Sequence, residues 1–289
     1  MTIQKYRIAF MGTPAVSAQY IETLFKNHYN IVAVYSQPAR PKGRGMKAQP
    51  SPVQVFAEKK NLPFFSPISL SDKKEFEHFK SLNIDLAIVI GYGNLIPENF
   101  LKQSTFGFIN IHFSLLPKWR GASPIEHSLL NGDSKTGVTI FKLIKNLDAG
   151  PILSSEEFII DDLLTKQELE LKLNLIGKNL LIKTLVNYFD NKIQLQEQDS
   201  QNQSYASKIT TNTRQIDFSK TAKEVYNQIR AFSPSPGAWF ILNNERIKII
   251  SCSIKNTKGE SSTVLSENFI IGCSDQSIEP LVIQREGKQ

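Results

Sequence analysis

The chain has 289 residues, of which 40% are hydrophobic, and this combination is typical of one or two folded domains with a substantial core. The net charge of +7 and the sequence pI near 9.2 favour a polyanionic partner, such as a nucleic acid or a phosphorylated substrate. No apolar window approaches the roughly 20 residues of a membrane span, and the N-terminus lacks the apolar core of a signal peptide. We therefore expect a cytoplasmic protein that does not bind membranes.

The first element in the chain is predicted to be a buried strand over residues 7–11. Gly12-Thr13-Pro14 follows it and predicts a tight turn and a helix with Thr13 as the N-cap and Pro14 as the first helical residue. The later glycines of a G-x-G-x-x-G motif are missing, so a dinucleotide cofactor is not expected.

Further strands and helices alternate along the chain. Apolar β-rich runs lie at 31–35, 86–90 and 108–111, and helical patterns lie at about 15–27, 52–60, 71–81 and 123–131. This alternation predicts an α/β fold with a doubly wound, mostly parallel, Rossmann-like sheet. A long amphipathic helix over 163–189 is expected to close this domain.

A change in composition marks the end of the first domain. Residues 190–207 are rich in Asn, Gln, Asp and Ser, as linkers are. Beyond them, short apolar runs alternate with turn residues, which predicts a small β-barrel of the oligonucleotide-binding type. We therefore expect a catalytic domain at 1–189, a linker at 190–207 and a β-barrel domain at 208–289.

Three polar residues suggest a catalytic site in the first domain. Asn110 and His112 fall at the end of a predicted strand, where ligands bind in such sheets, and Asp148 follows the strand predicted over 139–143. Attack of an amine on a formyl carbon needs a donor for the oxyanion and a group that accepts a proton near neutral pH. An amide, an imidazole and an orienting carboxylate supply these roles. Considered alone, each of the three could instead be an ordinary turn or loop residue without a catalytic role.

Other polar residues give weaker or negative signals. Cys252 and Cys273 form no C-x-x-C pair and are expected to be reduced and structural, and no histidine pair has metal-ligand spacing, so no catalytic metal is expected. The segment 37–47 carries four basic residues and two glycines, and no carboxylate occurs between Glu22 and Glu58. It is either a solvated charged loop or a loop that reaches phosphates and orders on binding.

The combined motif resembles the folate-dependent formyltransferases. It consists of Asn110-Ile-His112, the run Ser114-Leu-Leu-Pro-Lys-Trp-Arg-Gly121 and Leu147-Asp-Ala-Gly150, and the resemblance extends from Phe10 to the end of the chain. It implies 10-formyltetrahydrofolate as the formyl donor, with Asn110 and His112 holding the oxyanion and Asp148 supporting His112. The implied folate contacts are Ser114, Leu115, Leu116 and Pro117, with the pterin placed between them and Ile90, Gly91, Tyr92 and Gly93.

Within this family the chain is most similar to enzymes that formylate the methionine on initiator methionyl-tRNA in translation initiation. The resemblance implies that the segment 37–47 enters the acceptor arm of the tRNA and that the barrel lays a basic face along it. The candidate tRNA contacts are Arg40, Lys42, Arg44 and Lys47. Family members usually continue beyond the position of Gln289, so we expect a short C-terminus, and we expect a monomer.

Two alternatives remain at this point. A formyltransferase of the same chemistry could act on a small amine, such as a nucleotide-linked amino sugar or glycinamide ribonucleotide, although the latter enzymes lack the long basic loop and the second domain. A non-catalytic RNA-binding protein on a transferase scaffold would bind RNA without any dependence on folate. The intact trio of Asn110, His112 and Asp148 argues against this second alternative.

Overall fold

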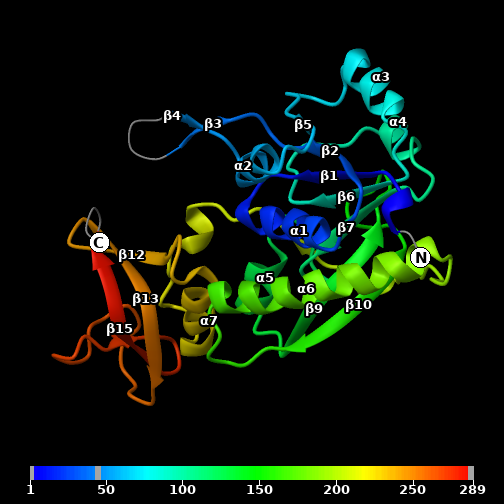
Figure 1. Cartoon of the computed structure of the whole chain (residues 1–289). Coiled ribbons are helices and arrows are strands. Elements are labelled where there is room, and N and C mark those ends of the chain that lie inside the picture. Colours follow the sequence, from blue (N-terminus) through cyan, green and yellow to red (C-terminus); the bar gives the residue numbers. More distant parts are fainter. Residues whose placement is uncertain (1–2, 43–46, 286–289) are drawn as a thin grey trace. The chain divides into compact units, whose positions relative to one another are not determined.

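The computed structural model describes residues 3–42 and 47–285 (Figure 1). The chain divides into two compact units, each built from separate stretches of sequence. The first unit comprises Met1–His112, Val138–Glu156 and Asn174–Gln201, and the second comprises Phe113–Gly137, Glu157–Leu173 and Asn202–Gln289.

A seven-stranded sheet, in the order β10-β9-β7-β6-β1-β2-β5, organises the first part of the chain (Figure 1). Neighbouring strands from β5 to β7 run parallel, and β9 runs antiparallel to β7. The predicted mostly parallel α/β sheet is thereby confirmed. The strands are β1 (Ile8–Gly12), β2 (Ile31–Tyr35), β5 (Phe64–Phe65), β6 (Leu86–Ile90), β7 (Phe108–His112), β9 (Lys135–Lys142) and β10 (Ile152–Ile159).

Helices pack against this sheet because its central strands are apolar on both faces. On one face, Ala9 and Met11 of β1 share a buried cluster with Phe79 of α3 and Phe100 of α4. The predicted helices are confirmed with small shifts at their ends. They are α1 (Ala15–Lys26), α2 (Pro52–Lys59), α3 (Lys73–Ser81), α5 (Pro124–Leu130) and α6 (Lys166–Phe189). The short helix α4 (Glu98–Leu101) was not predicted from the sequence.

The predicted cap of α1 is wrong. The N-cap is Pro14, which makes no side-chain capping bond. The Thr13 hydroxyl instead donates to the Tyr92 carbonyl oxygen at 2.9 Å and accepts the Gln37 backbone N–H at 3.3 Å. The Thr13 hydroxyl, which the local pattern predicts as the helix cap, therefore makes tertiary contacts instead.

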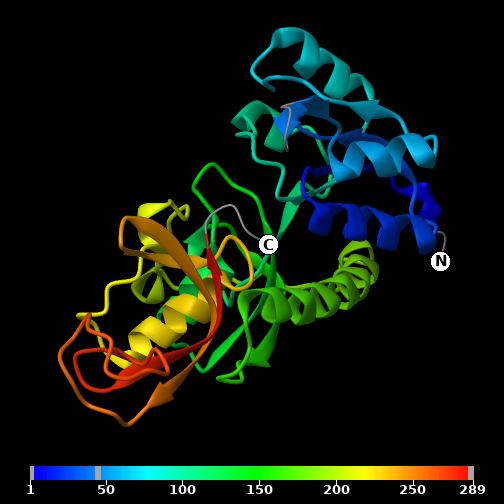
Figure 2. The ribbon, with the colours of Figure 1, turned by 90° about the vertical axis from the view of Figure 1, so that its left-hand side faces the viewer.

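The C-terminal part of the second unit is a helix packed on an antiparallel sheet. The sheet order is β12-β13-β15-β14, and Figure 2 shows α7 (yellow) lying against its orange and red strands. The small β-barrel predicted for this part of the chain is present as an antiparallel half-barrel sheet of four strands. The elements are α7 (Ala222–Phe232), β12 (Ala238–Leu242), β13 (Glu245–Lys255), β14 (Ile271–Gly272) and β15 (Ser277–Arg285).

Both cysteines lie in the core of this C-terminal sheet. They are free thiols, as expected, and burial raises the pKa of Cys252 to about 12 and that of Cys273 to about 11. Thiolates are the reactive form, so neither thiol is set up for chemistry.

The remaining described elements are short. The predicted linker contains β11 (Tyr205–Ala206), which pairs in parallel with β8 (Arg120–Gly121) within the second unit. The others are β3 (Arg40–Lys42), β4 (Lys47–Gln49) and the 3-10 turns Ile3–Lys5, Ser200–Asn202 and Asn212–Arg214. In residues 3–42 and 47–285, no helix is both long enough and apolar enough to cross a membrane.

Candidate active site

Asn110 and His112 lie at the carboxyl end of β7, in the middle of the sheet. Because side chains alternate along a strand, these two residues face the same side of the sheet. Asn110 pairs with Val89 of β6 and with Phe141 of β9, so strands hold this end of β7 from both sides. His112 is almost fully buried and meets the ring of Phe141 edge-on, with the centroids 6.3 Å apart.

Asp148 lies on the loop between β9 and β10. Its backbone is in the left-handed region with φ of 46°, and Gln198 fixes the loop by donating from Nε2 to the carbonyl oxygens of Asp148 and Gly150, both at 2.8 Å. Gly150 is required here, since a Cβ atom would lie 1.8 Å from the Lys142 carbonyl oxygen. Gln198 was missed because it belongs to a glutamine-rich stretch in which nothing in the sequence distinguishes it.

The structure brings His112 and Asp148 together. Nδ1 of His112 lies 3.8 Å from Oδ2 of Asp148, and both side chains are less than one-tenth exposed. This distance is longer than a hydrogen bond. At this separation the carboxylate still attracts a protonated imidazole by Coulomb interaction, because the buried pair is only weakly screened by solvent. The pair can therefore stabilise a proton that arrives on His112 during a reaction.

The loop after β6 is fixed by three side chains of the first unit. Ser17 donates to the Ile90 carbonyl oxygen at 2.6 Å, Thr13 donates to that of Tyr92, and Gln37 Nε2 donates to Asn94 Oδ1 at 3.1 Å. These bonds hold the backbone rigidly at the carboxyl edge of the sheet.

The candidate folate contacts of this loop come from its backbone. The side chains of Ile90 and Tyr92 are buried, whereas Gly91 and Gly93 are exposed and have φ of 56° and 81°. A Cβ atom on Gly93 would lie 2.4 Å from Nε2 of Gln37. The left-handed backbone conformation favours glycine here, and a side chain at this position would displace the flexible amide end of Gln37, in addition to blocking the close approach of a ligand that the sequence suggested.

The other candidate folate segment, residues 114–117, belongs to the second unit. Ser114 is fully buried, and its hydroxyl donates to the Lys118 carbonyl oxygen. Leu116 is also buried, whereas Leu115 and Pro117 are half-buried. Side-chain contacts with a ligand would therefore come from Leu115 and Pro117.

The basic segment forms a short antiparallel hairpin at its ends. Arg40 pairs with Gln49 and Lys42 pairs with Lys47, and the Arg40 side chain is exposed. Arg44, a further predicted tRNA contact, lies outside the described residues.

Comparison with known proteins assigns the family. The formyl transferase model matches residues 6–185, and the model of the formyl transferase C-terminal domain matches residues 208–289. The chain belongs to the formyl transferase family. It is 39% identical to the methionyl-tRNA formyltransferase of Pelagibacter ubique and 40% identical to that of Thermotoga maritima, in each case over 98% of this chain and 92% of the relative.

Solved structures show the same fold for this formyl transferase. The N-formyltransferase from Helicobacter canadensis, in complex with folinic acid and dTDP-3-aminofucose, superposes with a TM-score of 0.74 at 22% identity. The match covers 97% of this chain and 99% of that one. In residues 3–42 and 47–285, no group of three or more His, Cys, Asp or Glu side chains is arranged to hold a metal ion.

Proposed function

We propose that this protein transfers a formyl group from 10-formyltetrahydrofolate to the α-amino group of methionine on initiator methionyl-tRNA. The observation that carries the proposal is the buried His112–Asp148 pair, which lies at the end of the strand that also bears Asn110. Near 40% identity to methionyl-tRNA formyltransferases over almost the whole chain supports this choice of acceptor.

In this reaction, the main tasks of the protein are to position the two substrates and to stabilise the charges that develop on them. The bound folate supplies the formyl carbon, which forms a bond to the amine and loses its bond to the folate nitrogen. Asn110 donates its amide N–H to the formyl oxygen, where negative charge develops, and His112 contributes a second donor. His112 also accepts the proton that the amine loses and passes it to the departing nitrogen, while Asp148 stabilises the protonated imidazole. Because an α-amino group has an ordinary pKa of about 7.7–8.0, modest base assistance is sufficient.

A tRNA acceptor is favoured over a small amine by the charge of the chain. The hairpin of β3 and β4 presents the exposed Arg40, and the whole protein carries a net charge of +7. Small amino-sugar acceptors need no such basic projection, whereas a tRNA acceptor arm offers a row of phosphates.

The acceptor is tested by incubating the purified protein and 10-formyltetrahydrofolate with initiator methionyl-tRNA, elongator methionyl-tRNA or a dTDP-linked amino sugar. Formyl-methionine is quantified after mild hydrolysis of the tRNA ester. We expect product from the initiator tRNA and little from the other two acceptors. Product from the amino sugar alone would assign a small-molecule acceptor, and RNA binding without product on any acceptor would point to a non-catalytic protein.

We also propose that the protein acts as a cytoplasmic monomer. The proposed tRNA substrate supports a cytoplasmic location for the protein. Light scattering across a range of protein concentrations would test the monomer, since a mass well above 32.6 kDa would contradict it.

A further inference from the structure

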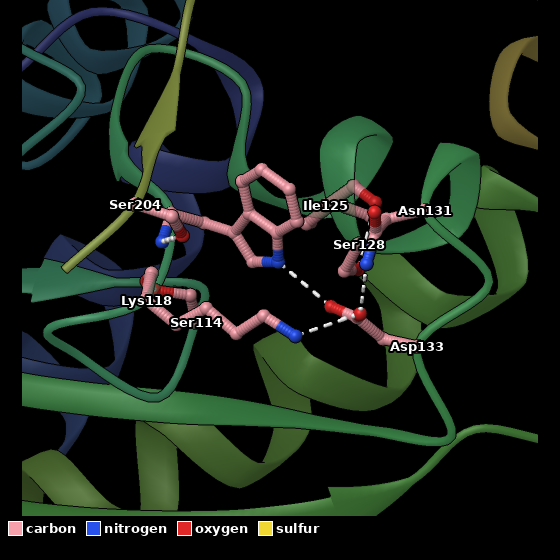
Figure 3. A network of polar contacts seen from close by, with 8 residues as sticks. Ser114, Lys118, Ile125, Ser128, Asn131, Asp133 and Ser204 are labelled. Carbon is pink, nitrogen blue, oxygen red and sulfur yellow. Dashed lines mark hydrogen bonds and ion pairs between the residues drawn. The ribbon is translucent and has the colours of Figure 1, made fainter. Parts of the chain in front are cut away.

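In the second unit, a nearly buried carboxylate that is not one of the candidate site residues accepts three hydrogen bonds. The Asp133 side chain is only 5% exposed. Its Oδ2 atom accepts from Nε1 of Trp119 at 2.7 Å, and its Oδ1 atom accepts from Nζ of Lys118 at 2.7 Å and from Nδ2 of Asn131 at 2.8 Å (Figure 3). Donors therefore satisfy both oxygens, as a buried carboxylate requires.

The carboxylate is presented by a rigid turn. Asp133 follows the C-terminus of α5, and its backbone N–H donates to the Ser128 carbonyl oxygen at 3.0 Å. The Asn131 backbone N–H, which caps the helix, donates to the carbonyl oxygen of His127, also at 3.0 Å. The position of the Asp133 carboxylate is thus fixed by α5.

Two of the three side chains that donate to Asp133, those of Lys118 and Trp119, belong to the residues directly after the candidate folate segment 114–117. That segment closes on itself, because the Lys118 N–H donates to the Leu115 carbonyl oxygen and the Ser114 hydroxyl donates to the Lys118 carbonyl oxygen. Fixing Lys118 from outside therefore fixes the turn that Ser114 and Leu115 form with it.

Trp119 needs such an anchor. Its backbone lies in the left-handed region with φ of 62°, a strained conformation that bulky residues rarely adopt. The bond from its indole to Asp133 holds the side chain, and its backbone N–H donates to the Ser204 hydroxyl at 2.9 Å. On that side, β8 and β11 continue the contact as a parallel ladder.

We propose that Asp133 is a positioning residue for the formyl donor: through Lys118 and Trp119 it fixes the segment 114–117 in the shape that binds the folate. This inference rests on the proposed function, because the role of the segment comes from the same resemblance. Loss of the anchor leaves that turn free to move before binding, and ordering it then weakens folate binding.

The test compares Asp133→Ala and Asp133→Asn with the unsubstituted protein. Asparagine keeps one oxygen that can accept from Trp119, but it loses the charge that pairs with Lys118. We expect Asp133→Ala to raise the Kd for 10-formyltetrahydrofolate, and its KM in the reaction, about tenfold, and Asp133→Asn to fall between. The KM for methionyl-tRNA should change by less than about twofold. A purely structural role would lower the active fraction or affect both substrates alike.

The fluorescence of the Trp119 indole gives a second readout. In a Trp239→Phe background, Trp119 is the only tryptophan, so its fluorescence reports this site alone. We expect Asp133→Ala to shift the emission to longer wavelength and folate to reverse part of the shift. Asp190→Ala is the matched control, since Asp190 also pairs with a lysine at 2.7 Å but in the first unit, away from segment 114–117 in the sequence.

If Asp133→Ala does not fold, Trp119→Phe and Lys118→Ala each remove one bond to Asp133 from a half-buried or exposed position. Each should then raise the folate Kd by about two- to fivefold. A folate Kd within about twofold of the parent value in the folded variants would overturn the inference. Equilibrium binding of folate needs no acceptor, so it tests the role of Asp133 even if the parent protein does not formylate methionyl-tRNA. Failure of that formylation would refute only the proposed function.

Discussion

At the scale of single residues, the candidate site combines polar side chains from β7 with one from the loop between β9 and β10. Asn110 and His112 share one face of β7, and Asp148 approaches His112 from a loop that Gln198 holds. We expect His112→Ala to lower kcat by about 10²–10⁴-fold and Asn110→Ala by about 10²–10³-fold, because in the proposed mechanism both residues stabilise mainly the transition state. Single-turnover rates with bound methionyl-tRNA would measure these losses.

The control for these variants is His28→Asn. His28 has φ of 59° after the end of α1, a backbone conformation that asparagine tolerates. This variant should keep full activity. A His112→Ala variant that turned over within a few-fold of the parent would show that the catalytic assignment is wrong.

Gln198 provides a second residue-scale prediction. Gln198→Ala removes two hydrogen bonds to the loop of Asp148 without touching a reacting group. We expect a loss of about 1–3 kcal/mol of stability and about a tenfold lower kcat, since Asp148 would no longer be held near His112. Urea unfolding and steady-state kinetics measure the two effects. The exposed Gln194→Ala should change neither, and equal effects in both variants would contradict the role of Gln198.

At the scale of elements, α7 has a capping box that should give the second unit a pH-dependent contribution. The Glu224 carboxylate accepts the Thr221 backbone N–H at 2.9 Å and the Thr221 hydroxyl, and these bonds hold the pKa of Glu224 below its ordinary value. A carboxyl whose pKa is lowered on folding stabilises the fold above the pKa of the unfolded chain. That stability is lost as the pH falls through the folded pKa.

We therefore expect Thr221→Ala to cost about 0.5–2 kcal/mol at pH 7 and clearly less at an acidic pH below the folded pKa of Glu224, where the carboxylate of the parent is protonated. Urea unfolding of both proteins at the two pH values gives the difference. A cost that stayed constant between them would show that the Glu224 half of the box contributes nothing.

The elements also show how far a single sequence can predict this fold. The buried strands of β1, β2, β6 and β7 and the helices between them follow from apolar periodicity, which is a local signal. The Thr13 hydroxyl and the pairing of β8 with β11 depend on partners about 80 residues away, so no local pattern reveals them.

The candidate site divides in the same way. The motif predicted that Asn110, His112 and Asp148 act together, and the structure places His112 beside Asp148. Gln198 and Asp133 support the candidate segments through side chains that carry no chemical signature in the sequence. Their types are ordinary, and only the folded geometry distinguishes them from other glutamines and aspartates.

At the scale of the whole molecule, the charge of +7 should make acceptor recognition depend on salt. If the protein neutralises about three phosphates, raising the salt from about 50 to 200 mM should lower kcat/KM for methionyl-tRNA by tens of fold. The KM for 10-formyltetrahydrofolate should change far less, because a small ligand releases few counterions.

Arg40→Ala should reduce the slope of log kcat/KM against log salt by about one and leave kcat unchanged, because we propose that the hairpin of Arg40 contacts tRNA phosphates and takes no part in the reaction itself. Lys80→Ala, an exposed charge on α3, is the matched control and should keep the parent slope. Equal slopes for all three proteins would mean that the hairpin makes no phosphate contact. The basic charge would then act as a diffuse field that speeds the encounter with tRNA, and the effect of salt would fall on the association rate and not on the stability of the complex.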